Sequence, residues 1–131
     1  MNITANLRNA FQAHLSDTTV SNEFIEANHN ILELPSPVDL ISVVPAYMQW
    51  CINHPQSTSL VVTGTIWALA EYGRSKSPAN SYLNFRFLCN KAQVKAVVDF
   101  LEWCKQNQPY EDQEQIDRAH RNWQNTANSM I

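Results

Sequence analysis

Glycine is scarce in this chain, because the 131 residues contain only Gly64 and Gly73, whereas an average protein has about 7% glycine. Sandwiches and barrels use glycine heavily for the positive φ angles of their tight turns. Loops that cradle phosphate groups need several glycines close together. The sequence therefore predicts a single, mainly α domain whose helices are joined by short Pro, Asn and Ser loops. It excludes a Gly-rich nucleotide-binding motif.

The best-marked helix is predicted over residues 90–107. Asn90 is a favourable N-cap residue, and Gln93 follows it at the third helical position, as a capping box requires. Apolar residues recur behind this cap at three- and four-residue spacing, which places them on one helix face. They are Val94, Val97, Val98, Leu101 and Cys104. Lys95 and Asp99 lie four residues apart on the other side, where they can form an ion pair.

Two more helices are indicated earlier in the chain. The spacing of apolar residues predicts one over residues 2–15. Asn22 is a candidate cap for a short helix over residues 23–28. Together with the elements below, the pattern predicts a helical bundle of about five or six helices, compact over residues 1–108.

A further helix start is predicted at Ser36, a good N-cap residue that is followed by Pro37 at the first helical position. Asp39 stands three residues after this cap and would complete a capping box. Pro45 then either kinks one long helix or begins a new one, because proline removes a backbone hydrogen bond. The run of apolar residues ends at His54.

Residues 59–73 fit two interpretations. Their β-branched residues suit a buried strand, whereas their length and apolar spacing favour a helix that ends with Gly73 in the C′ position. Residues 82–88 alternate between apolar and polar side chains, as a strand does. A helix is favoured over 59–73, and a short β element formed near 59–66 and 82–88 is the alternative.

The last segment, residues 109–131, is mostly polar and predicts a helix with a thin apolar seam. Ile116, Ala119 and Trp123 form this seam at helical spacing. Such a helix would pack on the compact part of the chain or stay partly free and reach for a partner.

Charge is distributed unevenly, although the net charge is only −3. Residues 1–72 hold six acidic and one basic residue, a net charge of −5. Residues 73–107 hold six basic and two acidic residues, a net charge of +4. Two interpretations follow: the two segments attract each other within the fold, or the second one exposes a basic patch to an acidic partner.

The three cysteines, Cys51, Cys89 and Cys104, do not suggest a disulfide framework. Together with the lack of a secretory signal or a long apolar run, they predict free thiols and a cytoplasmic protein that does not enter a membrane. Cys51 and His54 lie three residues apart and could form a nucleophilic pair. A buried core thiol beside a capping histidine is the expected alternative. The histidines lack metal-ligand spacing, so neither a metal nor another cofactor is expected.

The region from about Val44 to Leu101 resembles a family of small bacterial helical proteins that has no established activity. The resemblance rests on a "PAY…W" helix, an apolar segment, a short "LNFRF" stretch and "NKAQVKAVVDFL". The matching residues are Pro45, Ala46, Tyr47, Asn84, Phe85, Phe87, Gln93, Ala96, Val97, Phe100 and Leu101. It implies a helical packing pattern and carries over no functional residue.

The sequence favours a non-catalytic module that binds a protein partner, of the immunity type by analogy of class. Such a protein would neutralise a cognate toxin. Recognition would use residues 17–39 or the polar C-terminal helix. The candidate partner-binding residues are Glu23, Glu26, Glu33, Arg86, Lys91, Lys95 and Trp123. The alternatives are a nucleic-acid-associated regulator that uses the basic residues of 74–95, which the overall acidity disfavours, and a cysteine-dependent enzyme.

Overall fold

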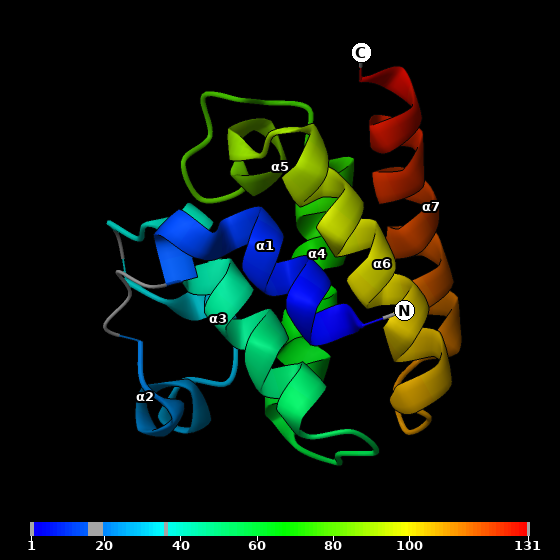
Figure 1. Ribbon diagram of the computed structural model, residues 1–131. Helices are drawn as coiled ribbons and strands as arrows, with labels where there is room; N and C mark the ends of the chain where they lie inside the picture. The colour runs from blue at the N-terminus through cyan, green and yellow to red at the C-terminus, as the bar shows by residue number, and fades with distance from the viewer. Residues whose placement is uncertain (1, 16–19, 36, 131) are drawn as a thin grey trace.

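The structure is a computed structural model that describes residues 2–15, 20–35 and 37–130. It confirms the mainly α fold, since these residues form seven α-helices, one 3-10 helix and no strand (Figure 1). In chain order the elements are α1 (Ile3–Leu15), α2 (Asn22–Ala27), the 3-10 helix η1 (Ile31–Glu33), α3 (Leu40–Asn53), α4 (Leu60–Arg74), α5 (Phe85–Leu88), α6 (Lys91–Asn107) and α7 (Gln113–Ser129).

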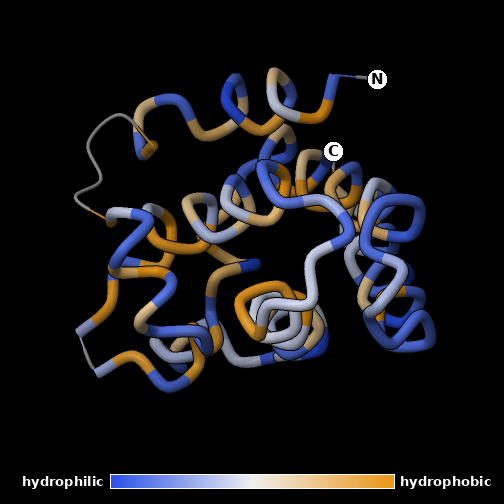
Figure 2. The backbone as a smooth tube through the Cα atoms, turned by 90° about the horizontal axis from the view of Figure 1, so that it is seen from below, coloured by the Kyte–Doolittle hydropathy of each residue, from blue (hydrophilic) through white to orange (hydrophobic). Residues whose placement is uncertain are grey.

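Helix α4 lies in the middle of the bundle. It packs against α3, α7, α5 and η1, while α1 packs across α3 and α6. Figure 2 shows hydropathy changing within single turns of the helices, as in amphipathic helices that turn one side to their neighbours. Among the described residues, no helix combines the length and the apolarity needed to cross a bilayer.

The capping box predicted for α6 is confirmed. The Asn90 side chain accepts a hydrogen bond from the Gln93 backbone N–H at 2.9 Å, and the Gln93 side chain accepts one from the Asn90 N–H at 2.8 Å. The predicted apolar face is buried, including Cys104, which is 0% exposed. The pair between Lys95 and Asp99 is also present, at 3.7 Å.

The predicted start of α3 was wrong. The helix begins at Leu40, after Asp39, whose carboxylate accepts a hydrogen bond from the Ser42 hydroxyl at 2.9 Å and caps no backbone N–H. Pro37 therefore precedes the helix, and the predicted cap at Ser36 lies outside the described residues. Pro45 lies within one continuous helix, so it does not open a new one.

Residues 60–74 form a helix, as favoured, in spite of their β-branched side chains. The Ser59 hydroxyl oxygen caps the helix by accepting from the Val61 N–H at 3.1 Å. The buried Thr65 hydroxyl donates to the Val61 carbonyl at 2.8 Å, which satisfies its polar group inside the core. Burial on several sides thus outweighs the weak intrinsic preference of these residues for strands.

The β element near 59–66 and 82–88 was a wrong alternative. With 60–74 helical, a strand at 82–88 would have no neighbour to satisfy its backbone groups. Residues 85–88 instead form the short helix α5, which buries Phe85 completely. The Phe85 ring lies 5.5–6.2 Å from three aromatic rings on α1, α4 and α7, and these offset and tilted contacts join the helices. The three rings belong to Phe11, Tyr72 and Trp123.

Helix α7 packs on α4 and α6 through its predicted seam. Ile116, Ala119 and Trp123 are each 0% exposed. The indole N–H of Trp123 donates to the Leu69 carbonyl at 2.8 Å. Trp123 is therefore a core residue, and its proposed role in contacting a partner is corrected: a side chain without exposed surface cannot be reached in this conformation.

A buried amide joins the ends of α3 and α6. Gln108 is 0% exposed, and its side-chain NH₂ donates to the carbonyls of Cys51 and His54 at 3.1 and 3.0 Å. Its side-chain oxygen accepts from the Ser57 N–H at 3.1 Å. These bonds connect the residue after α6 to carbonyl groups at the end of α3, where the Cys51 carbonyl also accepts from the His54 N–H at 3.1 Å.

Both glycines lie in α4, and each stands where another segment comes close. A side chain at Gly64 would overlap the carbonyl oxygen of His29 in the backbone leading to η1. A Cβ at Gly73 would lie 2.9 Å from the indole nitrogen of Trp123. The predicted C′ role of Gly73 was wrong, because α4 continues to Arg74 and no described glycine has a positive φ. The missing side chains are needed for packing.

Gly64→Ala is expected to lower the free energy of unfolding by about 1–3 kcal/mol, because backbone must move to accept the methyl group. Gly73→Ala is expected to cost about 1 kcal/mol, since only a ring must shift. The exposed helical control Asn125→Ala should gain up to about 0.5 kcal/mol from helix propensity. Urea denaturation measures all three. A Gly64→Ala variant as stable as the wild type would contradict the close approach.

Candidate functional site

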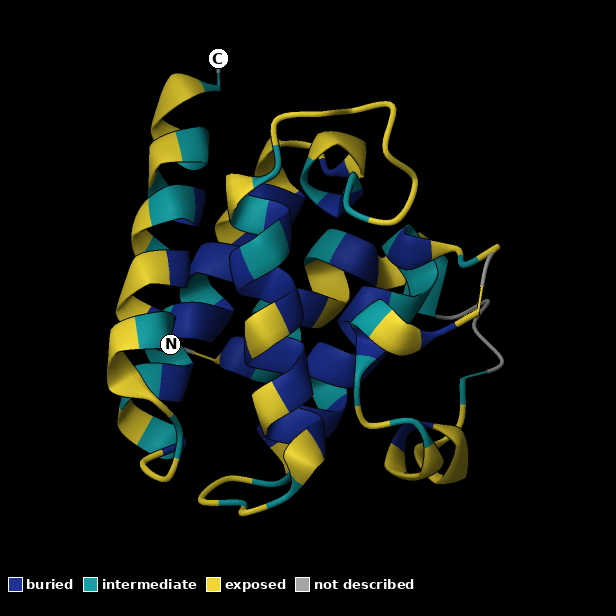
Figure 3. Cartoon of the chain, turned by 180° about the vertical axis from the view of Figure 1, so that it is seen from behind, coloured by how far each residue is buried: buried dark blue, intermediate teal, exposed yellow. Residues whose placement is uncertain are grey.

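A hollow of about 430 Å³ lies between α4 and the segment that links α2 to η1. On the α4 side its wall contains Leu60, Thr63, Gly64 and Trp67. The other wall comes from residues 27–30, Glu33 and Leu34. We call it the Trp67 hollow. In Figure 3 the exposed residues of α4 follow one side of a helix that is otherwise mostly buried.

Two large apolar side chains of this stripe are open to solvent. Trp67 is 52% exposed and Leu60 is 61% exposed. They stand seven residues apart, two helical turns, on the same face of α4. This exposure could not be expected from the sequence, because α4 is apolar almost all round and apolar spacing does not show which face of such a helix stays uncovered. This stripe remains exposed because α3 and α7 pack on other faces of α4.

The polar groups of the hollow are largely engaged. The Asn28 side-chain NH₂ donates to the Phe24 carbonyl at 2.9 Å. The backbone carbonyl of Asn28 accepts from the Tyr47 hydroxyl at 2.6 Å. The Thr63 hydroxyl donates to a carboxylate oxygen of Glu111 at 3.0 Å. Glu33 differs: in the part of the chain that the structure describes, its carboxylate makes no hydrogen bond or ion pair.

The three predicted acidic residues have different surroundings. Glu33 lines the Trp67 hollow. Glu26 accepts a hydrogen bond from the indole N–H of Trp50 at 3.0 Å, so it ties α2 to α3. Glu23 is exposed in the first turn of α2. One of the three therefore belongs to a concave site.

The predicted basic residues are not part of the lining of this hollow and belong to α5 and the start of α6 (Figure 1). Arg86 donates to the Ser75 carbonyl at 2.5 Å and to the Thr126 hydroxyl at 3.3 Å, and burial lowers its pKa. Lys95 pairs with Asp99, and Lys91 is exposed. Arg86 thus holds the loop after α4 against α7, which leaves two lysines as surface charges.

The attraction predicted between residues 1–72 and 73–107 is seen in one direct ion pair of the described chain. That pair joins Glu71 to Arg74 at 3.7 Å within α4. A larger network connects α6 to α7, where Lys105 lies 3.5 Å from Glu102 and 3.5 Å from Asp117. Within the described residues, no ion pair therefore joins the acidic groups around the Trp67 hollow to the basic segment.

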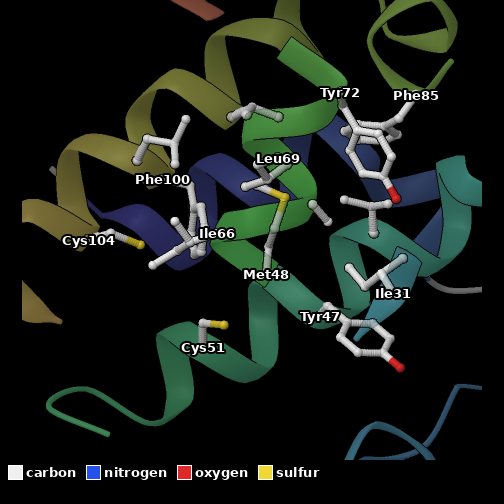
Figure 4. Packing of buried hydrophobic residues seen from close by; sticks show 14 of the residues in the cluster. Ile31, Tyr47, Met48, Cys51, Ile66, Leu69, Tyr72, Phe85, Phe100 and Cys104 are labelled. Atoms are coloured by element: carbon white, nitrogen blue, oxygen red, sulfur yellow. The ribbon is translucent and has the colours of Figure 1, made fainter. Parts of the chain in front are cut away.

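The Cys51–His54 pair is not arranged as a nucleophile and its base. Cys51 is fully buried (Figure 4), and burial raises the pKa of its thiol to about 12. The His54 ring stacks on Trp50, with ring centroids 3.8 Å apart, and its Nδ1 lies 2.7 Å from the Trp50 carbonyl oxygen. Since a carbonyl only accepts, Nδ1 carries the proton. No described hydrogen bond joins the imidazole to the thiol.

The other two thiols are equally enclosed. Burial raises the pKa of the Cys89 thiol to about 12. Burial is also the main reason why the pKa of the Cys104 thiol lies well above its ordinary value, and repulsion from an ionised Cys51 adds to the rise. The described residues also contain no group of three or more His, Cys, Asp or Glu side chains placed to hold a metal ion.

No protein-family model, curated protein or solved structure matches this chain. The resemblance to small bacterial helical proteins therefore stays a hypothesis.

The three thiols are expected to react slowly with a disulfide reagent at about pH 8, because only the thiolate attacks and each pKa lies far above the ordinary value of about 8.5. In denaturant all three should react at the rate of a free cysteine. Absorbance of the released thiol measures both rates. Rapid reaction of Cys51 in the folded chain below about pH 8 would contradict this assignment and favour the enzyme hypothesis.

Glu111 is expected to make stability depend on pH. Burial, mainly, raises the pKa of this carboxyl, and the Thr63 hydroxyl partly offsets the rise. Above the ordinary carboxyl pKa of about 4.3, the folded chain therefore binds more protons than the unfolded chain until the raised pKa is passed, and stability falls as pH rises through this window.

The test compares the wild type with Glu111→Gln and Thr63→Val in urea at about pH 4 and about pH 7. Glu111→Gln should lose less stability over this interval than the wild type. Thr63→Val should lose more, because it removes the hydrogen bond that favours the ionised form. Parallel pH profiles for all three chains would show that Glu111 does not titrate as inferred.

Proposed function

We propose that this chain is a non-catalytic module that binds a protein partner through the Trp67 hollow. The observation that carries the proposal is the pair of large exposed apolar side chains, Trp67 and Leu60, at the wall of a concave site. Tryptophan is enriched among the residues that dominate the binding energy of interfaces. An apolar centre with a polar rim is also the usual anatomy of such surfaces.

Other exposed apolar residues offer a poorer site. Tyr82 lines a hollow of only about 70 Å³. Phe87 is partly covered by the guanidinium of Arg86, which lies 4.3 Å from the ring centroid. The depression between α1 and α6 is lined by amides, alanines and His14, without a large apolar side chain. The Trp67 hollow alone among these combines volume with an exposed aromatic ring.

The charge of this region favours a basic partner. Glu33 lines the hollow and Glu111 lies behind Thr63, while residues 1–72 carry a net charge of −5. A small acidic protein that covers a basic protein surface fits the immunity type, in which a cognate toxin is sequestered. Free cysteines suit a reducing compartment, so the cytoplasm is the proposed location.

The alternatives have less support. Arg86 is engaged inside the protein and Lys95 is paired, so few cations of the 74–95 segment are free to neutralise phosphates. The enzyme hypothesis needs an accessible thiolate, and Cys51 is fully buried.

Site-specific photo-crosslinking tests the proposal. Trp67→p-benzoylphenylalanine is expected to form a covalent adduct with one protein in the native cells. Phe87→p-benzoylphenylalanine, at an exposed aromatic position of α5 outside the hollow, is the matched control and should not. The adduct is identified by mass spectrometry, and the purified partner should bind the wild type and bind Leu60→Ser at least about tenfold more weakly.

Equal adducts at positions 67 and 87 would overturn the proposal, because they indicate random collision. So would turnover of a small molecule by the purified chain without any adduct at position 67.

A further inference from the structure

We propose that the Trp67 hollow receives an arginine side chain of the partner, whose guanidinium stacks on the indole of Trp67 and forms an ion pair with Glu33. This inference rests on the proposed function, since it names the chemistry of the partner at the same site. Among the described residues, three independent features of the hollow support it: an acceptor without a partner, an exposed ring and a lining without a lysine or arginine.

The hydrogen-bonding groups of the hollow favour a donor as ligand. Its Asn28 and Thr63 side chains donate to groups of the protein itself. The Asn30 side-chain oxygen accepts from the Leu32 N–H at 3.0 Å. The Glu33 carboxylate, in contrast, has no partner within the described chain. A carboxylate only accepts, so a cationic donor is its natural complement.

The exposed ring favours a planar cation. Trp67 lines the hollow together with Thr63 and Gly64 of the preceding turn, the direction in which side chains on a helix lean. Gly64 lets the backbone of His29 and Asn30 lie directly against α4, which brings the opposite wall of the hollow close to this turn. Tryptophan is the best aromatic partner for a cation placed over its face. A planar guanidinium can stack on the ring and still donate two N–H groups to a carboxylate. An ammonium makes both interactions less well.

The described residues that line the hollow do not supply this cation. Lysine and arginine are absent from the described lining of the hollow, and the only titratable base there is the exposed His29. Arg74 lies two turns beyond Trp67 on α4 and pairs with Glu71. Glu111, held by Thr63, adds a second negative group beside the hollow. A positively charged side chain from outside is therefore attracted to it.

Short peptides test this inference without the natural partner. Acetyl-Gly-Arg-Gly-amide is titrated into the ¹⁵N-labelled chain, and the indole N–H of Trp67 and the amide of Gly64 are followed by NMR. Both signals are expected to shift with saturation. The neutral isostere with citrulline in place of arginine should bind at least about fivefold more weakly, and the lysine peptide should fall between them.

Matched variants separate a specific site from general acidity. Glu33→Gln and Trp67→Leu should each weaken arginine binding about threefold or more. Glu23→Gln, which removes another exposed carboxylate on α2 outside the hollow, should leave it unchanged. Equal binding of arginine and citrulline peptides, or insensitivity to Glu33→Gln, would overturn the inference.

The peptide titration tests the arginine inference and the crosslinking tests the proposed function, so either one can fail without the other. A protein adduct at position 67 without arginine binding would refute the arginine inference and leave the proposed function intact. Arginine binding at the hollow without a protein adduct would support the site chemistry and refute the proposed function.

Discussion

Helix α4 touches another segment at each of its two glycines, and most of the structure is arranged around these two approaches. At Gly64 the carbonyl of His29 comes so close that no side chain fits. At Gly73 the indole of Trp123 takes the space of a side chain and donates to the Leu69 carbonyl one turn earlier. These contacts fix η1 on one side of α4 and α7 on another, so the central helix is buried on several faces.

The candidate binding site is a consequence of the same arrangement. Because α3, α7 and η1 cover the other faces of α4, its remaining stripe is the one that carries Leu60 and Trp67. The approach at Gly64 brings the segment with Glu33 next to that stripe. An apolar surface and a carboxylate that has no partner among the described residues therefore meet at one place, although they come from separate parts of the chain.

The same packing explains why chemistry at the thiols is disfavoured. Cys51 and Cys104 face the interior among large apolar side chains (Figure 4), where ionisation would be costly. The buried amide of Gln108 closes this end of the core by binding the carbonyls at the end of α3. The aromatic and acidic groups of the proposed binding site lie instead at the surface.

Elements with strong local signals could be predicted from the sequence, and those that depend on distant contacts could not. The capping box at Asn90 and Gln93 was identified correctly because it satisfies the backbone within one turn. The alternation at 82–88 was misleading, since Phe85 is buried by rings from three other helices and not by a neighbouring strand. Of the residues proposed to contact a partner, Glu33 lies in the hollow, whereas Trp123 is in the core.

The sequence by itself determined a mainly helical chain, the amphipathic face of α6 and the burial of Cys104, because spacing and caps act over a few residues. Only the tertiary structure decided that Trp67 is exposed while Trp123 is buried, and that both glycines serve packing. Each of these depends on which segment lies against α4. Such contacts join residues far apart in the chain, and a helix that is apolar on nearly every side does not specify which of its faces they will cover.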